Sequence, residues 1–130
     1  MTQQSDRVNF ILRFCLSYPA RPREETVHAA GQLLRLARKY QRLAEEECDG
    51  PGDYIHRIPY PRAGKILDQW QAGLEKRQEA TAAKIRALCT EWSLPVDLGG
   101  DPRGYCVKVH FPDGKGNTWG GDSEGWGVPS

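Results

Sequence analysis

Residues 65–92, KILDQWQAGLEKRQEATAAKIRALCTEW, decide how this chain folds. Within them an apolar or small side chain recurs every seven residues, at Leu67, Leu74, Thr81 and Leu88. Ile66, Trp70, Ile85 and Trp92 lie beside these positions. A seven-residue repeat predicts a long helix with a coiled-coil-like seam. Such a seam needs a second helix to cover it, from the same chain or from another copy, so a homo-oligomer through residues 65–92 is one expectation.

A second long helix is expected over residues 22–47. Pro22 suits the first helical position, and the acidic pair Glu24 and Glu25 suits the positive end of the helix dipole. Apolar residues follow at spacings of three or four, namely Val27, Ala30, Leu33, Leu34, Ala37, Tyr40, Leu43 and Ala44. The helices at 22–47 and 65–92 therefore predict a long antiparallel helical hairpin, preceded by a short helix over 6–17 that Ser5 would cap.

The connection over residues 49–64 is rich in proline, glycine and aromatic residues, and it is long for a link between two helices. His56, Arg57, Arg62 and Lys65 make it locally basic. Long ordered loops often carry function. The alternative is that this one only packs over the helices, and the sequence leaves both open.

Residues 93–130 indicate a small antiparallel sheet. A short strand is expected at 96–98, and apolar and polar residues alternate over 105–111 as in a half-buried strand. A turn over 112–117 would lead to a return strand at 118–119, which Gly120 and Gly121 would end, and a last strand is expected at 126–128. The predicted fold class is α+β, one domain over 1–130 with a helical part (1–92) and a glycine-rich β part (93–130).

Composition excludes few classes of protein. The net charge is +1 and the mean hydropathy is −0.66, so no global field directs the chain to polyanions. No apolar run approaches the roughly 18–20 residues of a membrane span, so we expect a cytoplasmic protein without membrane contact. The four cysteines (Cys15, Cys48, Cys89, Cys106) are far apart, which favours buried thiols over a disulfide or zinc framework. Neither a metal nor a cofactor is expected.

The stretch from Gly99 to Pro129 is the expected working surface. The turn Asp101-Pro102-Arg103-Gly104 would hold Arg103 as a rigid fork for a phosphate or carboxylate, although an Asp101–Arg103 pair would equally well only shape the turn. Trp119 and Trp126, among many glycines, suit a flat ligand such as a nucleobase, or else cap the sheet. The expected ligand-binding residues are Asp101, Arg103, Lys108, Lys115, Trp119 and Trp126.

A second candidate surface is the basic stripe of Arg35, Arg38, Lys39 and Arg42, which share one helix face. Such a stripe binds a phosphate backbone or is simply a solvated face. Catalytic residues are not expected. Cys106 and His110 share a strand face, but residues four apart on a strand are roughly 13 Å apart, too far for direct hydrogen bonding.

Several segments resemble small uncharacterised proteins of tailed bacteriophages and prophages. They are GDPRGY at 100–105, NTWGG at 117–121, GWGVP at 125–129 and the helix LLRLARKYQRLAE at 33–45. The group has no established activity, so the resemblance assigns no residue a role. What it implies is a phage or prophage origin and residence in the host bacterial cytoplasm.

Two functions are carried forward from the sequence. The first is a non-enzymatic phage accessory protein that counteracts a bacterial anti-phage defence, by inhibiting a host defence protein or sequestering a signalling nucleotide. The second is a nucleic-acid-binding accessory protein that uses the basic stripe of Arg35, Arg38, Lys39 and Arg42.

Overall fold

The computed structural model describes residues 3–99, 106–112 and 118–120. Three helices come first, α1 (Gln3–Ser17), α2 (Arg23–Asp49) and α3 (Arg62–Glu91), with a short 3-10 helix η1 (Asp53–Arg57) between the last two. Three short strands follow, β1 (Val96–Leu98), β2 (Val107–His110) and β3 (Thr118–Gly120). The predicted α+β class is confirmed. None of the described helices combines the length and hydropathy that a membrane-spanning helix needs.

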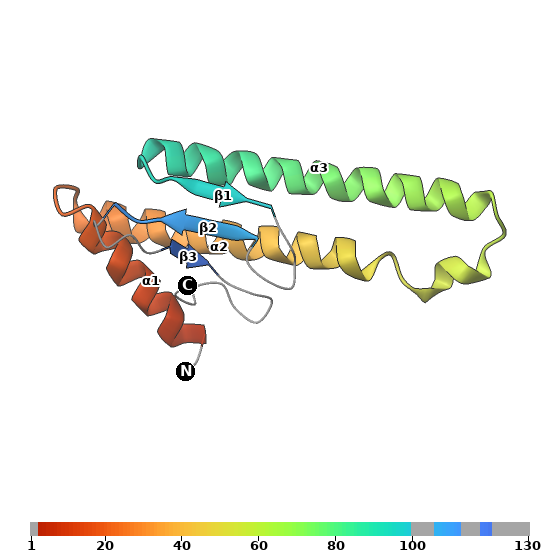
Figure 1. The fold of residues 1–130 in the computed structure, drawn as a ribbon, viewed down its shortest axis with the longest axis horizontal. Coiled ribbons are helices and arrows are strands. Elements are labelled where there is room, and N and C mark those ends of the chain that lie inside the picture. The colour runs from red at the N-terminus through yellow and green to blue at the C-terminus, as the bar shows by residue number, and fades with distance from the viewer. Residues whose placement is uncertain (1–2, 100–105, 113–117, 121–130) are drawn as a thin grey trace.

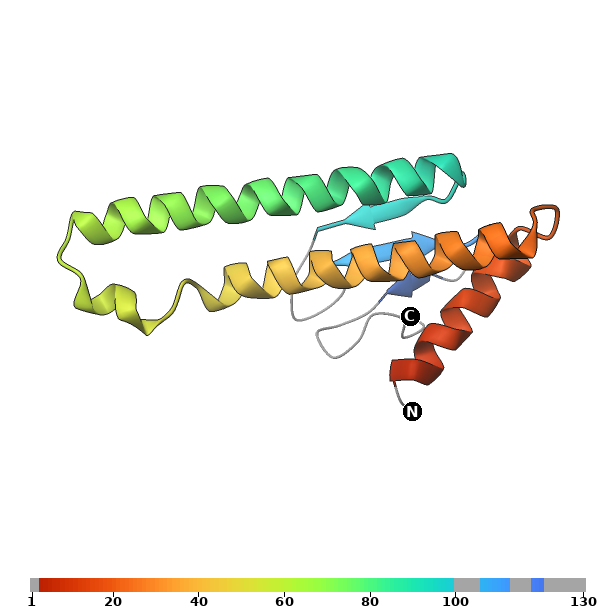
Figure 2. The same ribbon diagram turned by 180° about the vertical axis from the view of Figure 1, so that it is seen from behind.

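The helical hairpin is the longest feature of the fold. Figures 1 and 2 show α2 and α3 side by side and antiparallel, with η1 at the end of the hairpin that is farthest from α1 and the sheet. The predicted seam holds at Leu74 and Thr81, which are buried, whereas Leu67 is 39% exposed and Leu88 is half-buried. Since α2 of the same chain packs on α3, the seam has its partner within the chain. Association of copies through α3 stays a prediction.

The ends of the long helices have identifiable stop signals. Gly50 follows α2 with a φ of 80°, and its N–H donates to the Glu46 carbonyl at 2.9 Å. After α3, Ser93 takes a φ of 50°, and the Leu94 N–H donates to the Cys89 carbonyl at 2.8 Å. At the other end of the chain the prediction was wrong in detail, because α1 begins at Gln3 and Ser5 lies inside it.

The sheet is antiparallel in the order β1-β2-β3. Val96 is the register partner of Val109, and Gly120 is the register partner of Lys108. Gly120 therefore continues the return strand that it was expected to end. The sheet lies on one face of the hairpin, in front of α2 in Figure 1 and behind it in Figure 2. The strand expected at 126–128 lies outside the described residues.

One apolar core joins the helices to the sheet. Phe10 and Phe14 of α1 contact Phe111, just after β2, with ring centroids 5.4 and 6.4 Å apart. Phe14 also packs on Trp92 at 5.3 Å. The largest fully buried side chains of this core come from α1, α2, α3 and β2: Phe10, Phe14, Leu33, Leu34, Ile85, Val107 and Val109.

The connection between α2 and α3 is built around η1. Ile55 is buried there, at 9% exposure, while Tyr54 and Tyr60 are exposed. Ile55 therefore anchors this segment in the protein, and a functional role for the segment stays a prediction.

Candidate binding site on the helical hairpin

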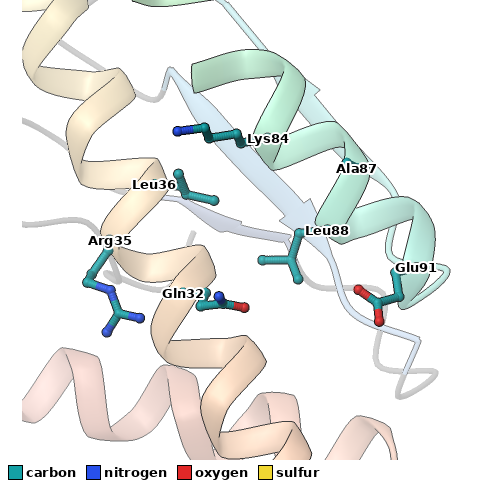
Figure 3. A pocket seen from close by; sticks show the side chains of 7 residues that line it. All are labelled: Gln32, Arg35, Leu36, Lys84, Ala87, Leu88 and Glu91. Atoms are coloured by element: carbon teal, nitrogen blue, oxygen red, sulfur yellow. The ribbon is translucent and has the colours of Figure 1, made fainter. Parts of the chain in front are cut away.

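A hollow lies between α2 and α3. Its volume is about 440 Å³. Figure 3 shows it with the strands behind the two helices, so it opens on the hairpin face opposite the sheet. We call it the hairpin groove. It is lined by Gln32, Arg35, Leu36, Lys84, Ala87, Leu88 and Glu91.

The groove has apolar side chains on both walls between two charged ends. Leu36 of α2 and Leu88 of α3 are half-buried and lie on facing walls, and Ala87 is an exposed small residue beside them. Lys84 reaches toward α2 at one end of the groove, and Glu91 lies at the other end of the same α3 wall. Seven residues separate these two charges, which is about 10 Å along the helix axis.

Beyond Glu91 the groove continues into a smaller hollow of about 160 Å³ near the start of α2. Gln32, Leu88 and Glu91 line both hollows. Arg21 lies over the Trp92 ring there, with its Cζ atom 3.9 Å from the ring centroid, and its Nε atom is 3.5 Å from a Glu25 carboxylate oxygen. Arg21 is therefore held by an aromatic ring and a carboxylate.

The basic stripe predicted from the sequence runs along α2 from the groove. Arg35, Lys39 and Arg42 are exposed, and within the described residues neither they nor Lys84 form an ion pair. These four residues are called the cationic band below. Arg35 belongs to both features, because it also lines the groove, where its side chain points away from Lys84 (Figure 3).

Arg38 of the same stripe has a different setting. It is half-buried, and burial lowers the pKa of its guanidinium below the usual value, with Arg7 and Arg42 lowering it further. The stripe therefore continues onto α1 through Arg7. Positive charge gathers where α1 passes α2.

Most of the C-terminal residues expected to bind a ligand, namely Asp101, Arg103, Lys115 and Trp126, lie outside the described residues. Trp119 is described only by its backbone, as the register partner of Val109. Lys108 is half-buried on β2, opposite Asp97 of β1. The expectation that these residues form one surface stays a prediction.

His110 contacts Asp97, which was not among the candidate residues identified from the sequence. Its Nε2 atom is 2.8 Å from an Asp97 carboxylate oxygen, and both side chains are well exposed. The register explains this contact, because Asp97 faces Lys108 across the two strands and His110 is two residues further on the same face. Cys106 is fully buried instead, and its N–H donates to the Gln41 side chain at 3.3 Å.

The cysteines divide into two kinds. Cys89 and Cys106 are buried as expected, and burial raises the pKa of the Cys89 thiol to about 12. Cys48 is exposed, which corrects the prediction for that residue, and Cys15 is half-buried. In the part of the chain that the structure describes, His, Cys, Asp and Glu form no cluster of three that would hold a metal ion.

The groove residues Gln32, Leu36, Lys84, Ala87 and Glu91 were missed by sequence reasoning. A signal existed in their spacing of three, four or seven on each helix. This spacing did not identify the groove, because residues on every face of both helices are three, four or seven positions apart. Comparison with known proteins adds no assignment: the chain matches no protein-family model, no curated protein and no solved structure.

Proposed function

We propose that this protein acts by binding, and that the hairpin groove with its cationic band recognises an acidic and partly apolar surface of another protein. The observation that carries the proposal is a hollow of about 440 Å³ with Arg35 and Lys84 at its edge, neither of which forms an ion pair with another described residue. A basic face that contacts only solvent does not require half-buried leucines that line a cavity. A recognition surface uses both, because apolar contact contributes affinity and charge contributes specificity.

The partner in this proposal is a host defence protein, and the role is that of a phage or prophage accessory protein that inhibits it. Support for the phage origin comes only from the resemblance of residues 33–45, 100–105, 117–121 and 125–129. Sequestration of a signalling nucleotide by Arg103, Trp119 and the other C-terminal residues is the other form of the same role.

A phage-plating assay tests the proposal. Cells carrying a defence system that the wild-type protein suppresses would express Ala87→Glu, Lys84→Glu or Leu67→Glu. Ala87→Glu fills the groove with a like-signed charge for an acidic partner and conserves helix propensity, so we expect suppression to be lost. Leu67→Glu is the matched control, since Leu67 is an exposed α3 residue outside the groove. Full suppression by both groove variants, with normal circular dichroism, would refute the role of the groove.

A second candidate, nucleic-acid binding, is favoured by the neighbouring positive charges of Arg7, Arg38 and Arg42. Duplex binding through the cationic band would weaken steeply with salt, and the double variant Lys39→Glu/Arg42→Glu would reduce the slope of log K against log salt by about 2. Fluorescence anisotropy with a labelled duplex measures this slope. Affinity that is independent of salt would eliminate this candidate.

A further inference from the structure

We infer that the hairpin groove receives an amphipathic helix of the partner, which runs parallel to α3 with an acidic residue at Lys84 and a basic residue at Glu91. This inference rests on the proposed function and deepens it by naming the partner's structural element. It is carried by the shape of the groove, by the small residue Ala87 on its α3 wall and by the opposite charges at its ends.

The walls of the groove have the spacing that a third helix requires. Gln32 and Leu36 are four residues apart on α2, and Lys84 and Leu88 are four apart on α3. Rows of side chains four residues apart form the ridges between which the side chains of a neighbouring helix pack. An amphipathic helix in a groove between helices is also a common mode of peptide recognition.

Ala87 supplies the space for an apolar anchor. It is exposed and lines the groove, the half-buried Leu88 follows it on α3, and the half-buried Leu36 lies across the groove on α2. A large apolar residue of the partner placed over Ala87 would contact both leucines. Ala87 and Leu88 follow Lys84 by three and four residues, so the anchor lies three or four residues from the group that pairs with Lys84.

The charges at the two ends of the groove, together with the dipole of the bound helix, set the direction of that helix. Lys84 and Glu91 are about 10 Å apart along α3, which is seven residues on any helix that lies alongside. A partner helix with an acidic residue near its N-terminal end and a basic residue near its C-terminal end also complements its own dipole. The expected partner pattern is therefore acidic-x-x-apolar-apolar-x-x-basic, read in the same direction as α3.

A second copy of this chain offers that pattern on α3 without a large apolar anchor: Glu79, Ala82, Ala83 and Arg86 match it, but Ala82 is buried and Arg86 already pairs with Glu79 at 3.6 Å. Asp6 and Arg13 of α1 have the seven-residue spacing, but Phe10 between them is fully buried in its own core. Arg13 also lies over the Phe111 ring, with its Cζ atom 4.7 Å from the centroid. The pattern therefore belongs to another protein.

Two synthetic peptides test the inference. Both are alanine-based helices with a central pair of leucines; one carries Glu-x-x-Leu-Leu-x-x-Lys and the other carries Lys-x-x-Leu-Leu-x-x-Glu. Titration into the isotope-labelled protein, followed by backbone amide chemical shifts, gives the affinity and the location of binding. We expect the first peptide to shift amides around residues 32–36 and 84–91 and to bind about three- to tenfold more tightly than the second, as two partly exposed ion pairs allow.

The double variant Lys84→Glu/Glu91→Lys should reverse the preference, and Leu67→Glu should leave it unchanged. Equal binding of both peptides, shifts elsewhere on the protein, or no shifts at millimolar peptide would overturn the inference. The proposed function fails separately, in the plating assay: if Ala87→Glu abolishes suppression while neither peptide binds, the groove remains the recognition surface but its occupant is not this helix.

Discussion

Replacing Gln41 by leucine should lower the free energy of unfolding by about 1–3 kcal/mol. Gln41 is 3% exposed, and its Oε1 atom accepts the N–H of Cys106 at 3.3 Å. Cys106 is itself 1% exposed, so water does not replace the lost acceptor. Leucine has a similar volume and leaves little cavity, so the expected cost is chiefly that of losing polar contacts in a buried setting. The bond joins α2 to the residue before β2, so its loss weakens the attachment of the sheet.

Urea unfolding monitored by circular dichroism measures this loss in the free energy of unfolding. In thermal unfolding, each kcal/mol lost lowers Tm by about 3–5 °C for a domain of this size. Gln78→Leu is the matched control. Gln78 is half-buried and donates to the Leu43 carbonyl at 3.3 Å and to Glu47 at 2.9 Å, groups that retain access to other donors. We expect its loss to cost under about 0.5 kcal/mol. A Gln41→Leu protein as stable as the control would refute the reasoning, because the Cys106 N–H would then have another acceptor.

Three further outcomes are expected. Burial, and secondarily Cys89, raises the pKa of Tyr18 to about 12 against the partial opposition of Arg21, so its contribution to stability is complete below its ordinary pKa of 10.0 and is lost as the pH rises toward 12. Tyr18→Phe should remove this alkaline loss without lowering stability at pH 7, since the buried hydroxyl has no hydrogen-bond partner among the described residues; urea unfolding at pH 7 and pH 11 compares the two proteins. Cys48 should react with a thiol reagent in the folded protein and Cys89 only after denaturation, which mass spectrometry of the labelled peptides reports. Ile85→Ala should lower the free energy of unfolding by about 2–5 kcal/mol in urea titrations, because Ile85 is fully buried, and a loss below 1 kcal/mol would contradict its place in the core.

The hairpin was predictable because long helices with apolar stripes leave few alternatives. The seven-residue repeat of α3 and the stripe of α2 predicted both helices to within a few residues. Periodicity alone did not show where burial along the repeat begins. Leu67 and Leu74 occupy equivalent positions in it, yet Leu67 is 39% exposed and Leu74 is fully buried. Burial depends on what packs nearby in space, which a repeat within one helix does not encode.

The contacts of the sheet were less predictable for the same reason. Alternation over 105–111 correctly indicated β2, and it placed Cys106 and His110 on one face. The partner of His110 is nevertheless Asp97, from a strand whose register against β2 was unknown before the structure. Pairing between strands is a long-range property. Of the residues that line the groove, Arg35 was identified from the sequence as part of a basic stripe. The opposite wall, with Lys84 and Glu91, was not identified, because its position depends on the rotation of α3 about its axis.

The position of the groove follows from how the chain distributes its apolar side chains. The sheet covers one face of the hairpin, and Leu33, Leu34 and Ile85 are fully buried in the core that it completes. Leu36 and Leu88 point instead into the groove on the opposite face, where they remain half-buried (Figure 3). A helix pair covered on a single face leaves apolar surface on the other, and in this chain that surface coincides with positive charges that form no ion pair within the part of the chain that the structure describes. Variants therefore distinguish the two candidate functions. Nucleic-acid binding requires only the positive charge, whereas binding of a protein partner is sensitive both to Ala87→Glu and to removal of the charge.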